Sequence, residues 1–316
     1  MSNTGFSRRG FLSSAATLAG GGYLSSLVSG PSPVSAAEPI KRTGKPNFKL
    51  SLAAYSFHRY LPYNKDQQVE AETKMSLDDF VHFCAEMNLD GVELTSYYFP
   101  HETTADYLLH LKELTFRLGL DVSGTAIGND FCVAGSEARE QELAYTRTWI
   151  DHAAVMGAPV IRIFAGTIPP GDTEEAALER CISAIDEAVA YAATKGVVLA
   201  LENHGGVTGT PEQILKIITA VKPSPWFGVN FDGGNFHTAD PYAALEQIAP
   251  YTVNAQLKVE VTPEGQPKQP ADLKRMVAIL KDAGYRGYLV LEYEAQEEPH
   301  EAIPRYLDEL RDIIAS

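Results

Sequence analysis

One stretch of the chain decides the fold: residues 173–202 read TEEAALERCISAIDEAVAYAATKGVVLALE. Residues 173–194 place apolar side chains at the spacing of an amphipathic helix. Gly196 stands where such a helix ends, and Val197–Glu202 is an apolar run with the length of a buried strand. The stretch is therefore a helix, a short turn and a strand, which together are one unit of an alternating α/β fold.

The same alternation runs through the chain from Phe48 onward. We expect strands at Lys49–Ser56, Gly91–Thr95, Asp121–Ala126, Val160–Phe164, Val197–Glu202, Phe227–Asp232, Thr252–Val259 and Tyr288–Glu292. We expect helices at Ser76–Met87, Ala105–Leu118, Glu137–Met156, Thr173–Thr194, Pro211–Val221, Pro241–Ile248, Pro270–Ala283 and Glu301–Ile314. Ser76, Thr210 and Asp240 stand where helix-capping side chains belong.

Eight strand–helix units over about 270 residues predict a single (β/α)₈ barrel, a TIM barrel of class α/β, covering residues 48–316. The alternative is a doubly wound open sheet, but no G-x-G-x-x-G motif follows the first strand. Residues 38–47 are expected to form a tail laid on the barrel, and residues 263–267 a loop after the seventh strand.

Four successive strands end in a polar side chain where packing alone favours an apolar one. These side chains are Glu202, Asp232, Gln256 and Glu292. The carboxyl ends of barrel strands meet at one mouth, where barrel enzymes place their active sites. Each residue alone could be a solvated strand end. Together, three carboxylates at one mouth repel one another unless a proton or a cation lies among them, and a divalent metal ion is the simplest solution.

At these residues the sequence resembles the sugar phosphate isomerase/epimerase, or xylose isomerase-like, barrels. The resemblance spans residues 47–314 and rests on the motifs LALENH, GVNFDGGN, NAQLKVE and LVLEYE. It implies one divalent metal ion held by Glu202, Asp232, Gln256 and Glu292. The family usually has a histidine where this chain has Gln256, and the resulting set of oxygen ligands favours Mn²⁺ or Mg²⁺ over Zn²⁺.

The resemblance also implies a reaction. The metal ion polarises the carbonyl of a keto sugar, one of Glu202 and Glu292 removes the adjacent C–H proton, and the other returns a proton to the opposite face of the enediolate. The resemblance therefore implies a metal-dependent isomerase or epimerase of a non-phosphorylated keto sugar or sugar derivative. Two alternatives stay open: a lyase or dehydratase acting on a keto sugar or 3-keto glycoside at the same site, and a sugar-binding barrel without catalysis.

Further residues are candidates for binding the substrate. Lys258 shares the inward face with Gln256, so it could stabilise an enolate or neutralise Glu292. Arg162, inside an apolar strand, is either a donor to substrate hydroxyls or an ion-pair partner of Glu202, and the second role is favoured. The remaining candidates are His204, Asn235, His237, Glu93 and His58.

The first 37 residues read as a twin-arginine export signal. Arg8 and Arg9 precede Phe11-Leu12 and a charge-free run rich in Ala, Gly and Ser, and the segment ends in small residues that suit cleavage. We therefore expect a periplasmic or secreted protein whose partners are the twin-arginine export machinery and a small carbohydrate. The run is too polar for a comfortable membrane span. The sequence leaves open whether the signal is cleaved and whether the chain forms a homo-oligomer.

Composition and charge exclude other classes of protein. The chain has 316 residues, of which 45% are hydrophobic, and a formal net charge of −15. An ordinary globular composition argues against disorder, and the negative charge argues against binding nucleic acid or an anionic membrane. Three cysteines, Cys84, Cys132 and Cys181, form neither a disulfide framework nor a zinc motif, so we expect them in the core.

Overall fold

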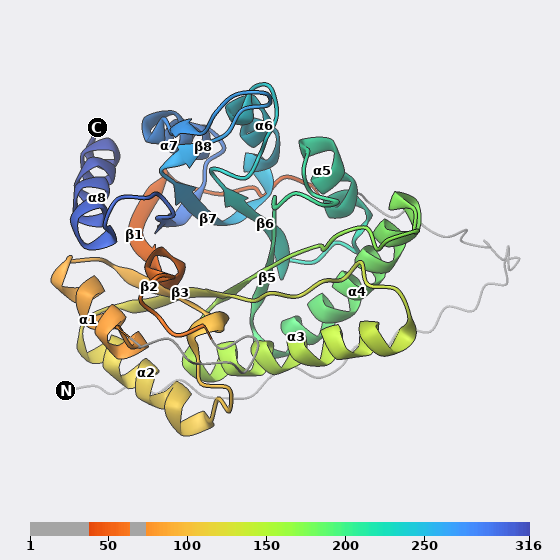
Figure 1. Ribbon diagram of the computed structural model, residues 1–316, viewed down its shortest axis with the longest axis horizontal. Coiled ribbons are helices and arrows are strands. Elements are labelled where there is room, and N and C mark those ends of the chain that lie inside the picture. The colour runs from red at the N-terminus through yellow and green to blue at the C-terminus, as the bar shows by residue number, and fades with distance from the viewer. Residues whose placement is uncertain (1–37, 64–73) are drawn as a thin grey trace, which may run out of the picture. The chain divides into compact units, whose positions relative to one another are not determined.

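Eight parallel strands form a closed barrel in this computed structural model, which describes residues 38–63 and 74–316 (Figure 1). The strands are β1 (Asn47–Ala53), β2 (Gly91–Thr95), β3 (Asp121–Ala126), β4 (Val160–Ile163), β5 (Val198–Glu202), β6 (Phe227–Asp232), β7 (Thr252–Lys258) and β10 (Arg286–Glu292). They pair in chain order, and β10 closes the ring against β1. The predicted (β/α)₈ barrel is confirmed. The expected export signal, residues 1–37, lies outside the described residues.

Within the described residues, eight α-helices alternate with the strands and cover the outside of the barrel (Figure 1). They are α1 (Leu77–Glu86), α2 (Ala105–Arg117), α3 (Ser136–Met156), α4 (Glu174–Lys195), α5 (Pro211–Ala220), α6 (Pro241–Ile248), α7 (Leu273–Asp282) and α8 (Pro299–Ala315). The predicted caps are present: the side chains of Ser76, Thr210 and Asp240 accept hydrogen bonds from backbone N–H groups of the first helical turn.

The structure differs from the expected elements by as much as three residues at two places. The first strand ends at Ala53, because Ala54–Phe57 turn into the short 3₁₀ helix η1. The seventh helix begins at Leu273 rather than Pro270, because β9 (Gln269–Pro270) pairs antiparallel with β8 (Glu260–Val261). This small hairpin follows β7 and carries the predicted loop 263–267 at its tip.

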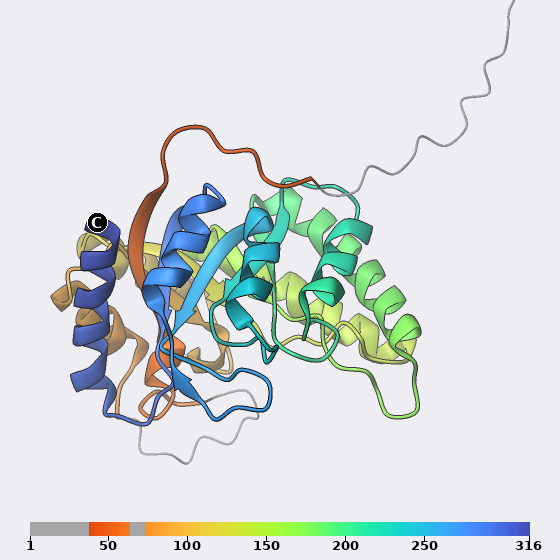
Figure 2. The ribbon, with the colours of Figure 1, turned by 90° about the horizontal axis from the view of Figure 1, so that it is seen from above.

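The tail packs at the end of the barrel opposite the mouth, and the cysteines pack in the core. Ile40 N donates to Pro250 O over 3.0 Å, and Arg42 donates to Thr252 O, so residues 38–46 lie across the amino-terminal end of the barrel (Figure 2). The cysteines expected in the core are buried and unpaired. No helix in the described ranges is long and apolar enough to cross a membrane.

Candidate active site at the carboxyl ends of the strands

The four residues of the proposed ligand set lie at the carboxyl ends of adjacent strands, β5, β6, β7 and β10. Glu202, Asp232, Gln256 and Glu292 are 3%, 0%, 1% and 6% exposed, respectively. The strand register pairs Asp232 with Gln256. It pairs Glu292 with Lys258, two residues after Gln256 on β7. Side chains two residues apart on a strand share one face, so the mouth holds two successive layers of polar groups.

Two basic side chains neutralise the buried carboxylates. Arg162 Nε lies 2.7 Å from Glu202 Oε2, so the ion pair that the sequence favoured is present. Lys258 Nζ lies 2.8 Å from Glu292 Oε2, 2.8 Å from Glu294 Oε1 and 3.6 Å from Asp232 Oδ2. Charges this deeply buried must be paired, and the two cations divide the carboxylates between them.

The unequal pairing moves the pKa values of the two glutamates apart. Burial raises the pKa of Glu202 to about 7, with Arg162 opposing the shift and Glu292 adding to it. Burial also acts to raise the pKa of Glu292, but the charge and hydrogen bond of Lys258 outweigh it and hold that pKa below its ordinary value. Burial raises the pKa of Asp232 as well. Two carboxyls at one mouth thus differ in proton affinity, as acid–base pairs do.

The loop after β6 holds Asp232 and Glu202 in place. Asp232 Oδ1 accepts from the N–H groups of Gly234 (2.8 Å) and Asn235 (3.0 Å), and Asn235 Nδ2 donates to Glu202 Oε1 over 2.9 Å. A Cβ on Gly234 would lie 2.8 Å from both Lys258 Cδ and Glu260 O, so glycine leaves room for the Lys258 stem. This contact explains the second glycine of the pair in the GVNFDGGN motif.

A layer of amides lies below the carboxylates, inside the barrel. Gln256 Nε2 donates to Glu93 Oε1 over 2.6 Å, and Gln256 Oε1 accepts from Asn230 Nδ2 over 2.5 Å. Asn254 Nδ2 donates to Glu93 Oε2 over 3.1 Å and to Asn230 Oδ1 over 2.8 Å. Glu93 has no exposed surface and both of its oxygens accept from amides, so it contacts the site through Gln256.

The three candidate histidines lie at separate places around the mouth. The His204 ring stacks at 4.2 Å on Phe164, and burial, with the charges of Arg162 and Lys258, lowers its pKa to about 4. His237 lines a hollow of about 210 Å³ together with Asn235, Lys258 and Glu294. His58 stacks on Tyr55 at 5.4 Å. His204 therefore lies within reach of the charges of Arg162 and Lys258, and His237 shares a hollow with Lys258.

The donors present fit a hard divalent cation. Asp232 Oδ2 is buried without a hydrogen-bond partner among the described residues, and it faces the other carboxylates. A carbonyl oxygen has two lone pairs, so Gln256 Oε1 can accept from Asn230 and still bind an ion, while Glu93 holds its NH₂ group away. The described residues form no preassembled cluster of three acidic, histidine or cysteine ligands, and the Lys258 ammonium supplies the positive charge there.

Sequence reasoning missed several residues that shape this site. Asn203 clamps the Asp232 backbone from both sides: its Nδ2 donates to Asp232 O and its Oδ1 accepts from Asp232 N. Glu294 is a third partner of Lys258, and Asn230 and Asn254 build the amide layer. Three of the four stand two residues from a predicted ligand, namely Asn230, Asn254 and Glu294. The alternation of strand side chains was therefore the signal that could have found them.

Comparison with known proteins gives the following matches. A family model described as xylose isomerase-like TIM barrel matches residues 81–313. Among solved structures, 3-keto-D-glucoside 4-epimerase from E. coli is 17% identical, with a TM-score of 0.64, over 85% of this chain and 100% of that one. A D-psicose 3-epimerase is 12% identical, with a TM-score of 0.68, over 85% and 100%.

A xylose isomerase-like TIM barrel protein from Mycobacterium smegmatis, solved in complex with magnesium, is 15% identical, with a TM-score of 0.65, over 84% of this chain and 96% of that one. The comparison with curated protein sequences found no match. At these identities the structural matches establish the fold.

Proposed function

Because the chain belongs to the xylose isomerase-like TIM barrel family, we propose that it is an isomerase or epimerase of a keto sugar. The observation that carries the proposal is the pair of buried carboxylates, Glu202 and Glu292, at one barrel mouth with a separate basic partner for each. A barrel that only bound sugar would need no such pair of buried carboxyls with different proton affinities. Two structural neighbours, the 3-keto-D-glucoside and D-psicose epimerases, support keto sugars as the substrate class.

The proposed reaction is a proton transfer at the carbon next to a carbonyl. One of Glu202 and Glu292 removes the C–H proton, the electron pair moves to the carbonyl oxygen to give an enediolate, and the other carboxyl returns a proton to the opposite face. Arg162 and Lys258 keep each carboxylate oriented toward the mouth and add positive charge near the developing oxyanion. Asn235 holds the second oxygen of Glu202.

We further propose that the enzyme uses one divalent metal ion, with Mn²⁺ or Mg²⁺ favoured. Glu202, Asp232, Gln256 and Glu292 would hold it, all through oxygen, which suits these hard cations. When bound, such an ion polarises a carbonyl and stabilises negative charge on oxygen. The magnesium complex of the M. smegmatis protein supports a metal ion in this fold.

The charge of the site favours a non-phosphorylated substrate. Asp232, Glu292 and Glu294 surround the single ammonium of Lys258, so a phosphate dianion would meet more negative than positive charge on this side of the mouth. The net charge of −15 acts in the same direction. A free keto sugar or a sugar derivative is the substrate class that we propose.

Exchange of substrate C–H into deuterated water tests the chemistry. The wild type should exchange one proton next to the carbonyl of a suitable keto sugar. Proton NMR measures this exchange. Glu202→Gln and Glu292→Gln should each slow exchange by about 10²–10⁴-fold, because a proton carrier is lost while the side-chain shape is kept. Glu212→Gln, on the exposed face of α5, is the matched control. Full exchange in both site variants would refute the assignment.

A further inference from the structure

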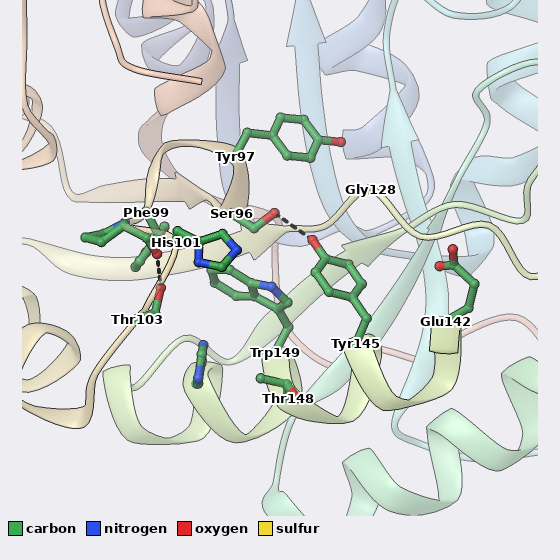
Figure 3. A pocket seen from close by; sticks show the side chains of 12 residues that line it. Ser96, Tyr97, Phe99, His101, Thr103, Gly128, Glu142, Tyr145, Thr148 and Trp149 are labelled. Atoms are coloured by element: carbon green, nitrogen blue, oxygen red, sulfur yellow. Dashed lines mark hydrogen bonds between the residues drawn. The ribbon is translucent and has the colours of Figure 1, made fainter. Parts of the chain in front are cut away.

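A second cavity lies beside the mouth, between the segment after β2 and helix α3 (Figure 3). Its volume is about 450 Å³, within the range of small-molecule sites. We call it the side pocket and define it by Tyr97, Phe99, His101, Tyr145, Trp149 and His152. In Figure 3, Tyr145 and Trp149 rise from one face of α3 below Ser96 and His101. They are four residues apart on the helix, which places both rings on the same side.

The side pocket is connected to the catalytic carboxylates through Tyr97. The Tyr97 side chain lines the pocket and is hydrogen-bonded to Arg162, which pairs with Glu202. The Tyr97 hydroxyl points away from His101, toward the strands (Figure 3). Tyr145 is held by Ser96, over 3.4 Å, and by the backbone of Gly128, which follows β3. Tyr97 therefore links the cavity to the ion pair at the carboxyl ends of β4 and β5.

The walls of the side pocket suit a hydroxylated ring. Phe99 and Trp149 pack edge to face at 5.1 Å, and four aromatic residues line the cavity, which allows stacking on the apolar face of a ring. His152 Nδ1 is buried and has no hydrogen-bond partner among the described residues. Burial lowers the pKa of His152, so the neutral imidazole can donate to or accept from a hydroxyl.

We propose that the side pocket is the subsite for a second sugar ring, so that the substrate is a keto sugar joined to another ring by a glycosidic bond. The inference rests on the proposed function and names its substrate class. The ring that reacts lies at the mouth over Glu202 and Glu292. The second ring lies against Tyr97 and Trp149, and its hydroxyls meet His101 and His152. No bond to the second ring is made or broken.

Paired substrates and pocket variants test the proposal in the full enzyme. The substrates are a methyl 3-keto-hexoside, with one ring, and a 3-keto-disaccharide. Thr148→Trp fills the cavity from an exposed position of α3, and His101→Ala removes an exposed contact. Each should lower kcat/KM for C–H exchange of the disaccharide by about 10-fold or more and leave the one-ring substrate within about 2-fold. Thr194→Trp, at an exposed position of α4, is the matched control.

The proposal is overturned if the pocket variants lower kcat/KM equally for both substrates, or lower it for neither. A binding measurement separates this result from a failure of the proposed chemistry. The chain has two tryptophans, so Trp226→Phe leaves Trp149, in the pocket, as the only fluorescent indole. Binding of the disaccharide should change the fluorescence emission of Trp149, and the one-ring glycoside should leave it unchanged. A fluorescence change without C–H exchange supports the subsite and refutes the proposed reaction. No change with the disaccharide refutes the subsite, whatever the reaction.

Discussion

At the scale of single residues, the site depends on how buried carboxyls share their protons and partners. Glu202 and Glu292 have opposite pKa shifts because burial outweighs the charge of Arg162 at Glu202, whereas the charge and hydrogen bond of Lys258 outweigh burial at Glu292. Glu93, deeper in the barrel, accepts hydrogen bonds from two neutral amides. Burial raises the pKa of Glu93 to about 7, the charge of Glu292 adds to the shift, and the amide hydrogen bonds oppose it. Glu93 therefore links folding to pH.

This linkage predicts the pH dependence of stability. The pKa of Glu93 is higher in the folded chain than its ordinary value of 4.5, so the folded state binds the extra proton between pH 4.5 and 7. The contribution of Glu93 to stability is thus fully present below pH 4.5 and is lost as pH rises toward 7. Glu93→Gln cannot titrate. From pH 4.5 to 7.5, the free energy of unfolding of the wild type should fall by on the order of 3 kcal/mol relative to that of the variant.

Urea unfolding of both proteins across this pH range, with a chelator present so that metal loading stays constant, gives the difference in the free energy of unfolding. The difference should change steadily through the range, because the other titrating groups are common to both proteins. Parallel stability curves would contradict the assigned pKa of Glu93.

At the scale of elements, the site exists because four neighbouring strands end together. Asp232 on β6 and Gln256 on β7 stand at the same register, and β10 and β5 bring Glu292 and Glu202 to the same mouth. The strand positions are set by backbone pairing and by the helices outside, so removing one side chain leaves the others in place. The donor set can therefore be tested one strand at a time.

Metal content is the measurement that tests the donor set. Elemental mass spectrometry of the purified protein should find about one divalent ion per chain, Mn or Mg, in the wild type, and its loss in Asp232→Ala because a buried anionic ligand is gone. Asp282→Ala, at an exposed position of α7, should keep the ion. Absence of the ion from the wild type after reconstitution with Mn²⁺ or Mg²⁺ would refute the proposed metal and leave Lys258 as the cation of the mouth.

At the scale of the whole molecule, we predict that the N-terminal segment directs the barrel to its location in the cell. The described residues form a closed ring of eight strands. Those residues lie outside the described part, and their role as an export signal stays a prediction from Arg8-Arg9 and the charge-free run. Twin-arginine export would suit a barrel that folds before it crosses the membrane.

Replacement of the arginine pair tests export. In a Gram-negative host, the wild-type chain should reach the periplasm, and Arg8→Lys with Arg9→Lys should leave most of the protein in the cytoplasm, because the lysines keep the charge but not the guanidinium groups. Cell fractionation and immunoblotting measure the distribution. Lys41→Arg with Arg42→Lys, beyond the predicted signal, is the control. Equal export of the wild type and the twin-lysine variant would contradict the prediction.

The sequence by itself determined the barrel and the strands that carry its polar mouth. Apolar runs of strand length alternate with helical patterns such as residues 173–194. This periodicity is a local property, so it can be recognised without knowledge of the fold. It also placed Glu202, Asp232, Gln256 and Glu292 at strand ends, because parallel strands in a barrel share one direction. The family resemblance rested on these same positions.

Only the tertiary structure decided which partners these residues have. Glu93 and Gln256 are 163 positions apart and meet at 2.6 Å only because the barrel closes. Lys258 pairs with three carboxylates, one on β6, one on β10 and one just after β10. Tyr97, which follows β2, is hydrogen-bonded to Arg162 on β4. Hydrogen bonds, ion pairs and cavities depend on the positions of atoms in three dimensions, whereas strand and helix patterns depend on neighbours along the chain. The side pocket between the segment after β2 and α3 was therefore found only from the tertiary structure.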